Sequence, residues 1–117
     1  MDKDVINTIN ASGGTGDLIQ GDISQYSQVR SIAENIRLKG GALNVLINNV
    51  GEYSTGEITQ FSVQKFKSII NTNLLGSYYM IQELHPIFNQ DGGNIINIGH
   101  TGINSLAASK QTTAYFN

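Results

Sequence analysis

Hydrophobic positions along the chain predict amphipathic helices separated by short buried strands. Apolar side chains recur at helical spacing in three stretches, residues 1–11, 24–39 and 62–85. Short apolar runs predict strands at residues 18–22, 43–47 and 94–98. Each helical stretch has end signals of the expected kind.

The predicted ends of the helices are marked by glycines and by hydroxyl side chains. Gly13 or Gly14 is expected to end the first helix, and Ser24 and Ser62 are placed to cap the second and third. A fourth helix is expected to begin near Thr112 or Thr113.

Helices and strands that alternate in this way predict parallel strands joined by crossover helices. The predicted fold class is therefore α/β, with a doubly wound sheet. A chain of 117 residues suggests one domain at most.

Composition narrows the classes of function. A formal charge of -2 and a pI near 5.5 argue against a general nucleic-acid binder, which would present a basic face. The absence of cysteine excludes disulfides and thiolate metal sites, and His85 and His100 lie far apart, so we expect no metal site. No apolar run approaches the roughly 20 residues that span a bilayer, and a cytoplasmic protein without membrane or nucleic-acid partners is expected.

Three motifs lie where chemistry is expected in such a fold, beyond the carboxyl ends of the strands. The first is INNVG at residues 47–51, which alone is compatible with an asparagine-rich turn. The second is Asn73 with Gly76, where the asparagine lies near the buried stripe of a helix and needs a partner. The third is Tyr115, which could act as an acid or base, or only pack.

In this order and spacing, the segments GDIS, LNVLINNVG, INTNLLGSYYM, GGNIINI and AYFN resemble the central part of the short-chain dehydrogenase/reductase family. The resemblance covers the chain from Leu18 onward and extends to Met1 by analogy. It implies a partial NAD(P)-binding Rossmann-type domain over residues 1–117, with NAD or NADP as cofactor.

The resemblance also implies roles for individual residues. Tyr115 would be the acid/base that protonates a carbonyl oxygen as hydride arrives from the nicotinamide, and Asn73 would hold a water in the proton relay. Asp22 would contact the adenine, with Ile23 beside it. The residues implied to contact the cofactor are Asp22, Ile23, Asn48, Asn49, Val50, Gly51, Ile98 and Tyr115.

The chain departs from the family pattern in its organisation. The first two strands, the phosphate loop and the C-terminal strands are missing, so the Rossmann-type sheet is expected to be incomplete. SGGTGD at residues 12–17 follows a helix and precedes a strand, which is the reverse of a phosphate-binding context. The family's lysine, four residues after the tyrosine, would fall at position 119, and Lys110 is no substitute.

The catalytic loop departs from the pattern as well. Family members usually carry two serines after the third strand, and here Gly99 and His100 take those places. Thr101 and Ser105 are candidate hydroxyls. His100 could donate a hydrogen bond instead, or could pack on the cofactor or substrate. The chain resembles divergent members with NIG at this point.

The leading hypothesis is an NAD(P)-dependent oxidoreductase acting on a carbonyl or alcohol substrate, inactive as this chain alone. One alternative is a non-catalytic dinucleotide-binding or scaffolding member of the same family. Another is an unrelated α/β module of the flavodoxin kind, which assigns no role to Asn73 or Tyr115. The resemblance also implies assembly into a homodimer or tetramer through the helix that ends near His85 and the helix that carries Tyr115, and the apolar run LLGSYYMI on the former suits such packing.

Overall fold

The computed structural model describes residues 2–54 and 56–99 and shows an incomplete α/β fold. Its helices are α1 (Asp2–Ala11), α2 (Tyr26–Leu38), α3 (Val63–Ile70) and α4 (Ser77–Leu84). A π-helical segment, η1 (Asn71–Gly76), joins α3 to α4, and a short 3₁₀ turn, η2 (His85–Ile87), follows α4. Two strands complete the order, β1 (Val45–Asn48) and β2 (Asn94–Asn97).

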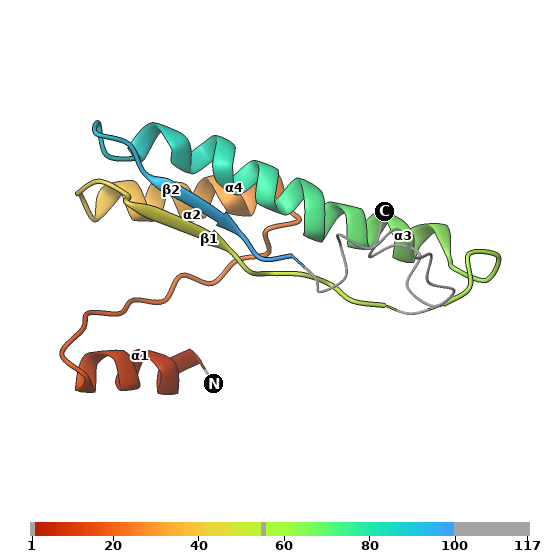
Figure 1. Cartoon of the computed structure of the whole chain (residues 1–117), viewed down its shortest axis with the longest axis horizontal. Coiled ribbons are helices and arrows are strands. Elements are labelled where there is room, and N and C mark those ends of the chain that lie inside the picture. The colour runs from red at the N-terminus through yellow and green to blue at the C-terminus, as the bar shows by residue number, and fades with distance from the viewer. Residues whose placement is uncertain (1, 55, 100–117) are drawn as a thin grey trace.

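The two strands form a parallel pair that is covered by helices on one side. Val45 pairs with Asn94 and Asn48 with Asn97. Figure 1 shows α2 and α4 running alongside the strands, while α1 stands apart at the end of an extended segment. This parallel pair and its crossover helices confirm the predicted fold class.

The core lies between β1 and the two helices. Leu46 of β1, Ala33 of α2 and Leu84 of α4 form its buried cluster. Leu46 keeps 7% of its surface exposed because its side chain points towards these helices. Burial of these aliphatic side chains is the main stabilising term of the described structure.

The opposite face of the sheet is uncovered among the described residues. Side chains alternate between faces along a strand, so Val45 and Ile47 point away from Leu46. Ile96 pairs with Ile47 in the register and shares that face. Val45, Ile47 and Ile96 are 42%, 58% and 43% exposed. Parallel strands are normally covered on both faces, so this apolar face is built for a further layer.

The strand predicted at residues 18–22 is wrong. Those residues belong to an extended segment without strand pairing among the described residues. A strand needs a neighbour for its backbone hydrogen bonds, and the described sheet contains only β1 and β2.

The predicted cap at Ser24 is also wrong, whereas the cap at Ser62 is confirmed. The Ser24 amide donates to Asp22 Oδ1 at 2.9 Å in a turn, and α2 begins two residues later, at Tyr26, with Gln25 as its N-cap. Ser62 Oγ accepts from the Lys65 amide at 3.1 Å at the start of α3. The helix start predicted near Thr112 or Thr113 lies outside the described residues.

Two glycines set the entry into β2. Gly92 has a φ of +98°, a region that disfavours other residues. A Cβ at Gly93 would lie 2.0 Å from Phe88 Cδ1 and 3.0 Å from the Asn44 carbonyl oxygen. The close approach of the Phe88 ring therefore requires glycine at position 93.

No helix within residues 2–54 and 56–99 combines the length and apolar character needed to cross a membrane.

Candidate active site

The carboxyl ends of β1 and β2 meet at one edge of the sheet. Asn48 and Asn97 pair in the register, and Asn48 Nδ2 donates to Asn97 Oδ1 at 2.9 Å. The Asn48 carbonyl oxygen accepts from the Ile98 amide at 3.0 Å, which extends the pairing by one residue. Asn48 is 9% exposed. Its side chain thus stabilises the strand ends at the edge where ligands bind in open α/β sheets.

The segment that follows β1 is open to solvent. Asn49, Val50 and Gly51 are all exposed, and the Asn49 side chain forms no hydrogen bond with another described residue. Ile98, at the end of β2, is 57% exposed. The structure thus brings Asn48, Asn49, Val50, Gly51 and Ile98 to the same edge of the sheet.

Asn73 binds the backbone of this loop through both polar atoms of its side chain. The Glu52 amide donates to Asn73 Oδ1 at 2.6 Å, and Asn73 Nδ2 donates to the Glu52 carbonyl oxygen at 2.9 Å. The partner that the sequence required for Asn73 is therefore the loop after β1. Because both polar atoms of its side chain bind the Glu52 backbone, Asn73 holds the loop after β1 against the helix.

The π-helical turn places Asn73 where it can reach the loop. In an α-helix, residues three or four apart share a face and residues five apart do not. A π turn closes its hydrogen bonds over five residues, so the chain rotates less per residue from Asn71 onward. This brings Asn73 round to the side that carries Ser68. Short π segments recur at functional sites, and sequence periodicity did not reveal this one.

Gly76, three residues beyond Asn73, supports a second predicted cofactor segment. A Cβ at Gly76 would lie 2.8 Å from Cδ1 and Cγ1 of Ile23 and 3.3 Å from its carbonyl oxygen. The Ile23 side chain thus packs directly on the backbone of η1. The neighbouring Asp22 uses Oδ1 to accept from the Ser24 amide, and its own amide donates to Gln28 Oε1 at 2.9 Å. The segment η1 therefore supports both the Asp22–Ile23 turn and the loop after β1.

Glu52, which is not part of any predicted motif, binds two side chains of α3 through its carboxylate. Its Oε1 pairs with the Lys65 ammonium, and its Oε2 accepts from Ser68 Oγ at 2.8 Å. The hydrogen bonds from Lys65 and Ser68 hold the pKa of Glu52 below its usual range, despite an opposing effect of burial. Lys65 and Ser68 are three residues apart, and this helical spacing was the signal in the sequence that the two side chains share a face of α3 and could share a partner.

Several predicted site residues lie outside the described part of the chain. These are His100, Thr101, Ser105, Lys110 and Tyr115. Their roles stay predictions.

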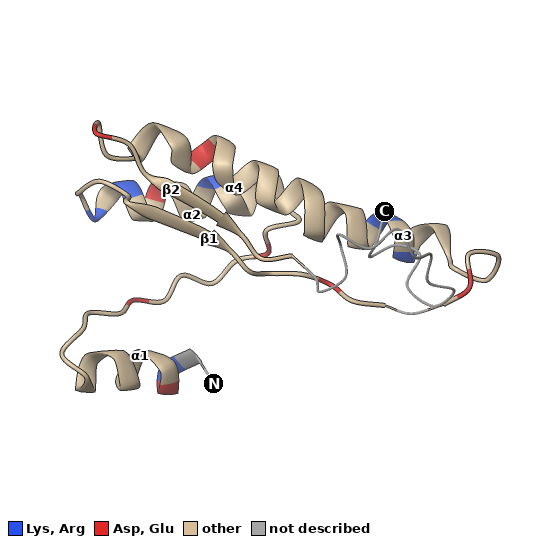
Figure 2. Cartoon of the chain, viewed as in Figure 1, with Lys and Arg blue, Asp and Glu red and all other residues tan. Residues whose placement is uncertain are grey.

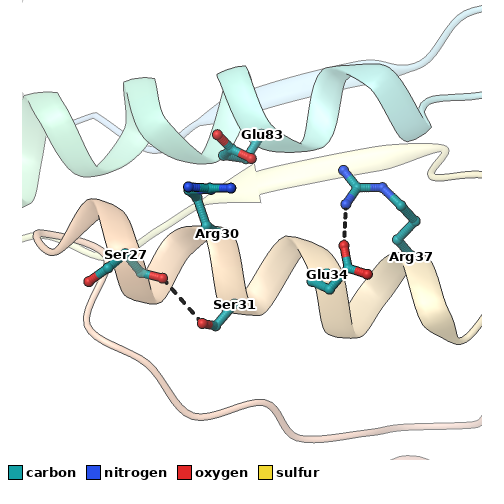
Figure 3. Close-up of a pocket in the computed structure, with 6 residues that line it drawn as sticks. All are labelled: Ser27, Arg30, Ser31, Glu34, Arg37 and Glu83. Carbon is teal, nitrogen blue, oxygen red and sulfur yellow. Dashed lines mark hydrogen bonds and ion pairs between the residues drawn. The ribbon is translucent and has the colours of Figure 1, made fainter.

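A separate cleft between α2 and α4 is a weaker candidate for a binding site. Its volume is about 450 Å³, and it is lined by Ser27, Arg30, Ser31, Glu34, Arg37 and Glu83. Figure 3 shows the Arg30 guanidinium pointing towards Glu83 and an ion pair between Arg37 and Glu34, 2.5 Å long. Two cations face two anions, so this cleft offers no net charge to a ligand.

Charge is distributed differently over the strands and helices. Figure 2 shows charged residues along the helices and loops, whereas β1 and β2 carry none. Within the described ranges, no three His, Asp or Glu side chains gather as metal ligands would.

Comparison with known families distinguishes a short-chain dehydrogenase/reductase from an unrelated flavodoxin-like module. The family model described as short chain dehydrogenase matches residues 2–116. The chain belongs to the short-chain dehydrogenase family. The unrelated flavodoxin-like alternative is therefore wrong, and the family assignment from the sequence motifs is confirmed.

Curated relatives of this short-chain dehydrogenase chain include named reductases. It is 33% identical over 105 residues to the ketoacyl reductase HetN of Nostoc, which covers 89% of this chain and 35% of that protein. It is 32% identical over 101 residues to the sepiapterin reductase of Chlorobaculum tepidum, covering 86% of this chain and 39% of that protein. The chain thus spans under half the length of these relatives.

Solved structures show the same fold. A blue fluorescent protein from a metagenomic library, in complex with NADPH, matches with a TM-score of 0.86 and 26% identity. That match covers 97% of this chain and 45% of the other. A short-chain dehydrogenase/reductase from Serratia marcescens matches with a TM-score of 0.89 and 21% identity, covering 98% and 46% of the two chains. The described residues are therefore an incomplete Rossmann-type fold.

Proposed function

We propose that the protein containing this chain is an NAD(P)-dependent oxidoreductase that transfers hydride between a nicotinamide and a carbonyl or alcohol substrate. The observation that carries the proposal is the attachment of two predicted cofactor segments to one π-helical segment. Asn73 holds the loop after β1 and Gly76 receives Ile23. Relatives with reductase names and a similar structure in complex with NADPH support the same function.

At Gly51 the backbone of the exposed edge is open to the approach of a dinucleotide. Gly51 has no positive φ, and a Cβ there would meet Asn73 Oδ1 at an ordinary contact distance of 3.8 Å. Unlike Gly76 and Gly93, Gly51 is therefore not required by packing among the described residues. A glycine at a strand end allows a ligand to approach the backbone closely. Asn48, Asn49, Val50 and Gly51 would line the adenosine and ribose side of NAD or NADP, with Ile98 at the neighbouring strand end.

Asp22 and Ile23 would contact the adenine. One carboxylate oxygen of Asp22 is engaged in the turn before α2, which fixes the side chain in place. Its Oδ2 accepts no hydrogen bond from another described residue and remains available for a donor on the adenine. Ile23 packs on Gly76 and would hold this turn against η1.

The bound nicotinamide would supply or accept the hydride, and residues of this chain would handle the proton. Tyr115 would donate a proton to the carbonyl oxygen during reduction and accept it during oxidation, because a bare alkoxide is costly in a dry site. The side chain of Asn73 is engaged with Glu52, so its part in a proton relay would fall to its backbone carbonyl oxygen, which accepts from Ser77 Oγ at 3.5 Å and has a second lone pair for a water. Thr101 or His100 would take the place of the usual serine and donate a hydrogen bond to the substrate oxygen.

The uncovered sheet face supports the proposal that residues 1–117 form part of a larger domain. Parallel strands with exposed Val45, Ile47 and Ile96 need a second layer, and the family's additional strands and helices would provide it. The chain alone would then be inactive. Leu74 and Tyr78, 61% and 55% exposed on η1 and α4, support assembly of the protein into a homodimer or tetramer through this helix.

Titration with NADH and NADPH, followed by fluorescence, tests the proposal on the protein that contains this chain and the family's other segments. We expect micromolar binding of at least one reduced cofactor. Tyr115→Phe should retain this binding and lose turnover of carbonyl substrates, while Tyr79→Phe, on α4 away from the proposed cofactor edge, serves as a matched substitution. Failure to bind either cofactor would overturn the proposed function.

Replacement of the usual serines by Gly99 and His100 favours one second candidate. A non-catalytic member of the family would bind NAD(P) and sense or scaffold through it. It predicts cofactor binding without turnover in the unmodified protein, together with unchanged binding in Tyr115→Phe. Turnover of any carbonyl substrate that is lost in Tyr115→Phe excludes this candidate.

A further inference from the structure

Glu52 connects the exposed loop after β1 to the helix beneath it through both its backbone and its side chain. Its backbone amide and carbonyl group bind the Asn73 side chain at 2.6 and 2.9 Å. Its carboxylate binds the Lys65 ammonium through one oxygen and Ser68 Oγ through the other. Glu52, the residue immediately after Gly51, thus contacts three residues of α3 and η1: Lys65, Ser68 and Asn73.

These contacts fix the direction of the chain at Gly51 from two sides. The contacts to Asn73 hold the peptide groups on either side of the Glu52 Cα. The contacts to Lys65 and Ser68 hold the end of the side chain, and the Lys65 amide is itself capped by Ser62. The loop therefore has little freedom to rotate about the Glu52 backbone without breaking a charge-assisted hydrogen bond.

We propose that the Glu52 carboxylate is a positioning residue that holds residues 49–51 in the conformation that receives the cofactor. The inference rests on the proposed function, since it concerns the same edge of the sheet. Binding of a ligand to a backbone held in place costs less ordering entropy than binding to a mobile loop. Loss of the carboxylate should therefore weaken cofactor binding without removing any group that touches the cofactor.

The negative charge of the Glu52 carboxylate is central to its contact with Lys65. Lys65 of α3 is the charged group that faces the carboxylate among the described residues, and Ser68 is its neutral partner. The Glu52 side chain is 27% exposed and that of Lys65 is 42% exposed, so solvent screens the pair in part. We expect an effect on cofactor affinity of about three- to fivefold.

The test compares E52Q with E57Q in the protein that contains this chain and the family's other segments. Glu57 lies in the same loop, is exposed, and has no side-chain bond to another described residue, so E57Q controls for the lost charge. Hydrogen exchange of the backbone amide of residue 52, which donates to Asn73 Oδ1, reports on the loop, and NADH or NADPH titration reports on affinity. E52Q should speed up exchange and raise the cofactor Kd by about three- to fivefold, with little change in melting temperature. E57Q should change neither.

Further variants separate positioning from a general structural role. K65M should resemble E52Q, and the double variant E52Q/K65M should be no worse than either, because one contact is removed in each case. K67M, on the same helix, is the control for the lost lysine. As pH falls through the lowered pKa of Glu52, the cofactor Kd should rise more in the unmodified protein and in E57Q than in E52Q.

Two results would overturn the positioning role alone, and a third would overturn the proposed function together with it. Unchanged exchange of the backbone amide of residue 52 in E52Q would show that the carboxylate does not hold the loop. Faster exchange with an unchanged cofactor Kd would show that the hold does not serve binding. If the unmodified protein binds neither cofactor, the proposed function fails, and the positioning role in cofactor binding fails with it even if exchange shows that the carboxylate holds the loop.

Discussion

The side chain of Asn73 forms a reciprocal pair of hydrogen bonds with the backbone of Glu52, accepting at 2.6 Å and donating at 2.9 Å. An asparagine is costly inside a helix because it competes for backbone hydrogen bonds. The π turn from Asn71 to Gly76 relieves that conflict by directing the amide outward, towards the loop. One helical irregularity and one polar side chain thus set the shape of the proposed cofactor edge.

We first predict that Asn73→Ala destabilises the protein by about 2 kcal/mol, since it leaves the Glu52 amide and carbonyl group without partners. Urea unfolding measures this loss, and hydrogen exchange should show a faster Glu52 amide. Asn71→Ala is the matched control, because Asn71 is exposed in the same π segment and its side chain has no hydrogen bond to another described residue. Equal effects of the two substitutions would show that the Asn73 side chain does not hold the loop through the Glu52 backbone.

A second prediction concerns the contact between Gly76 and Ile23. Alanine normally stabilises a helix relative to glycine by about 0.5–1 kcal/mol. Here the new Cβ would lie 2.8 Å from the Ile23 side chain, and the resulting strain should reverse the sign and cost about 1–3 kcal/mol. Thermal unfolding of Gly76→Ala and of Gly76→Ala with Ile23→Ala tests this. The second substitution should recover part of the loss, and an additive loss would show that Ile23 is not the obstacle.

The third prediction is a pH dependence of stability at alkaline pH. Tyr26 Oη donates to Glu83 Oε1 at 2.6 Å, and this hydrogen bond, with burial and the Glu83 charge, raises the pKa of Tyr26 above its ordinary value of 10.0. A raised pKa in the folded state means that the contribution is fully present below about pH 10 and is lost as pH rises through the folded value. Tyr26→Phe should abolish this alkaline loss.

Absorbance of the ionised phenol measures the pKa of Tyr26 directly, by difference between the unmodified protein and Tyr26→Phe. Glu83→Gln is the informative partner variant, because it keeps the size of the side chain and removes its charge. It should return the pKa of Tyr26 towards its ordinary value. A Tyr26 pKa that does not respond to Glu83→Gln would show that the bond between α2 and α4 does not form in solution.

The acid counterpart is a fourth prediction, at Glu52. Lys65 and Ser68 lower the pKa of this carboxyl group, so its contribution to stability is present above the unfolded value of about 4.3 and is lost as pH falls through the folded value. Urea unfolding between pH 7 and pH 3 should show a smaller acid loss in Lys65→Met than in Lys67→Met. Identical pH profiles for these two variants would exclude the ion pair.

Local patterns predicted those parts of the fold that depend on local physics. Ser62 caps α3 as expected because the bond from the Lys65 amide needs only four residues. The strand predicted at residues 18–22 failed because strand formation depends on a neighbouring strand, which no local pattern reports. The need of Asn73 for a partner was visible in the sequence. Its partner was not, because Glu52 is 21 residues away and the π turn that aims Asn73 has no periodic signal.

The last prediction concerns the uncovered sheet face. If further layers of the proposed larger domain cover Ile47, then Ile47→Ala in that larger protein should cost about 2–5 kcal/mol, as for a buried aliphatic side chain. In the present structure Ile47 is 58% exposed, while Leu46 is buried against the helices. Leu46→Ala is therefore the matched control and should be costly in any context.

Urea unfolding of the larger protein measures both substitutions, and binding of a hydrophobic dye to the isolated 117-residue chain provides an independent readout. The isolated chain should bind the dye through Val45, Ile47 and Ile96, and Ile47→Asn should reduce that binding. A cost below about 1 kcal/mol for Ile47→Ala in the larger protein would mean that this face stays open there. The two parallel strands would then be stabilised from one side alone, contrary to what parallel sheets require.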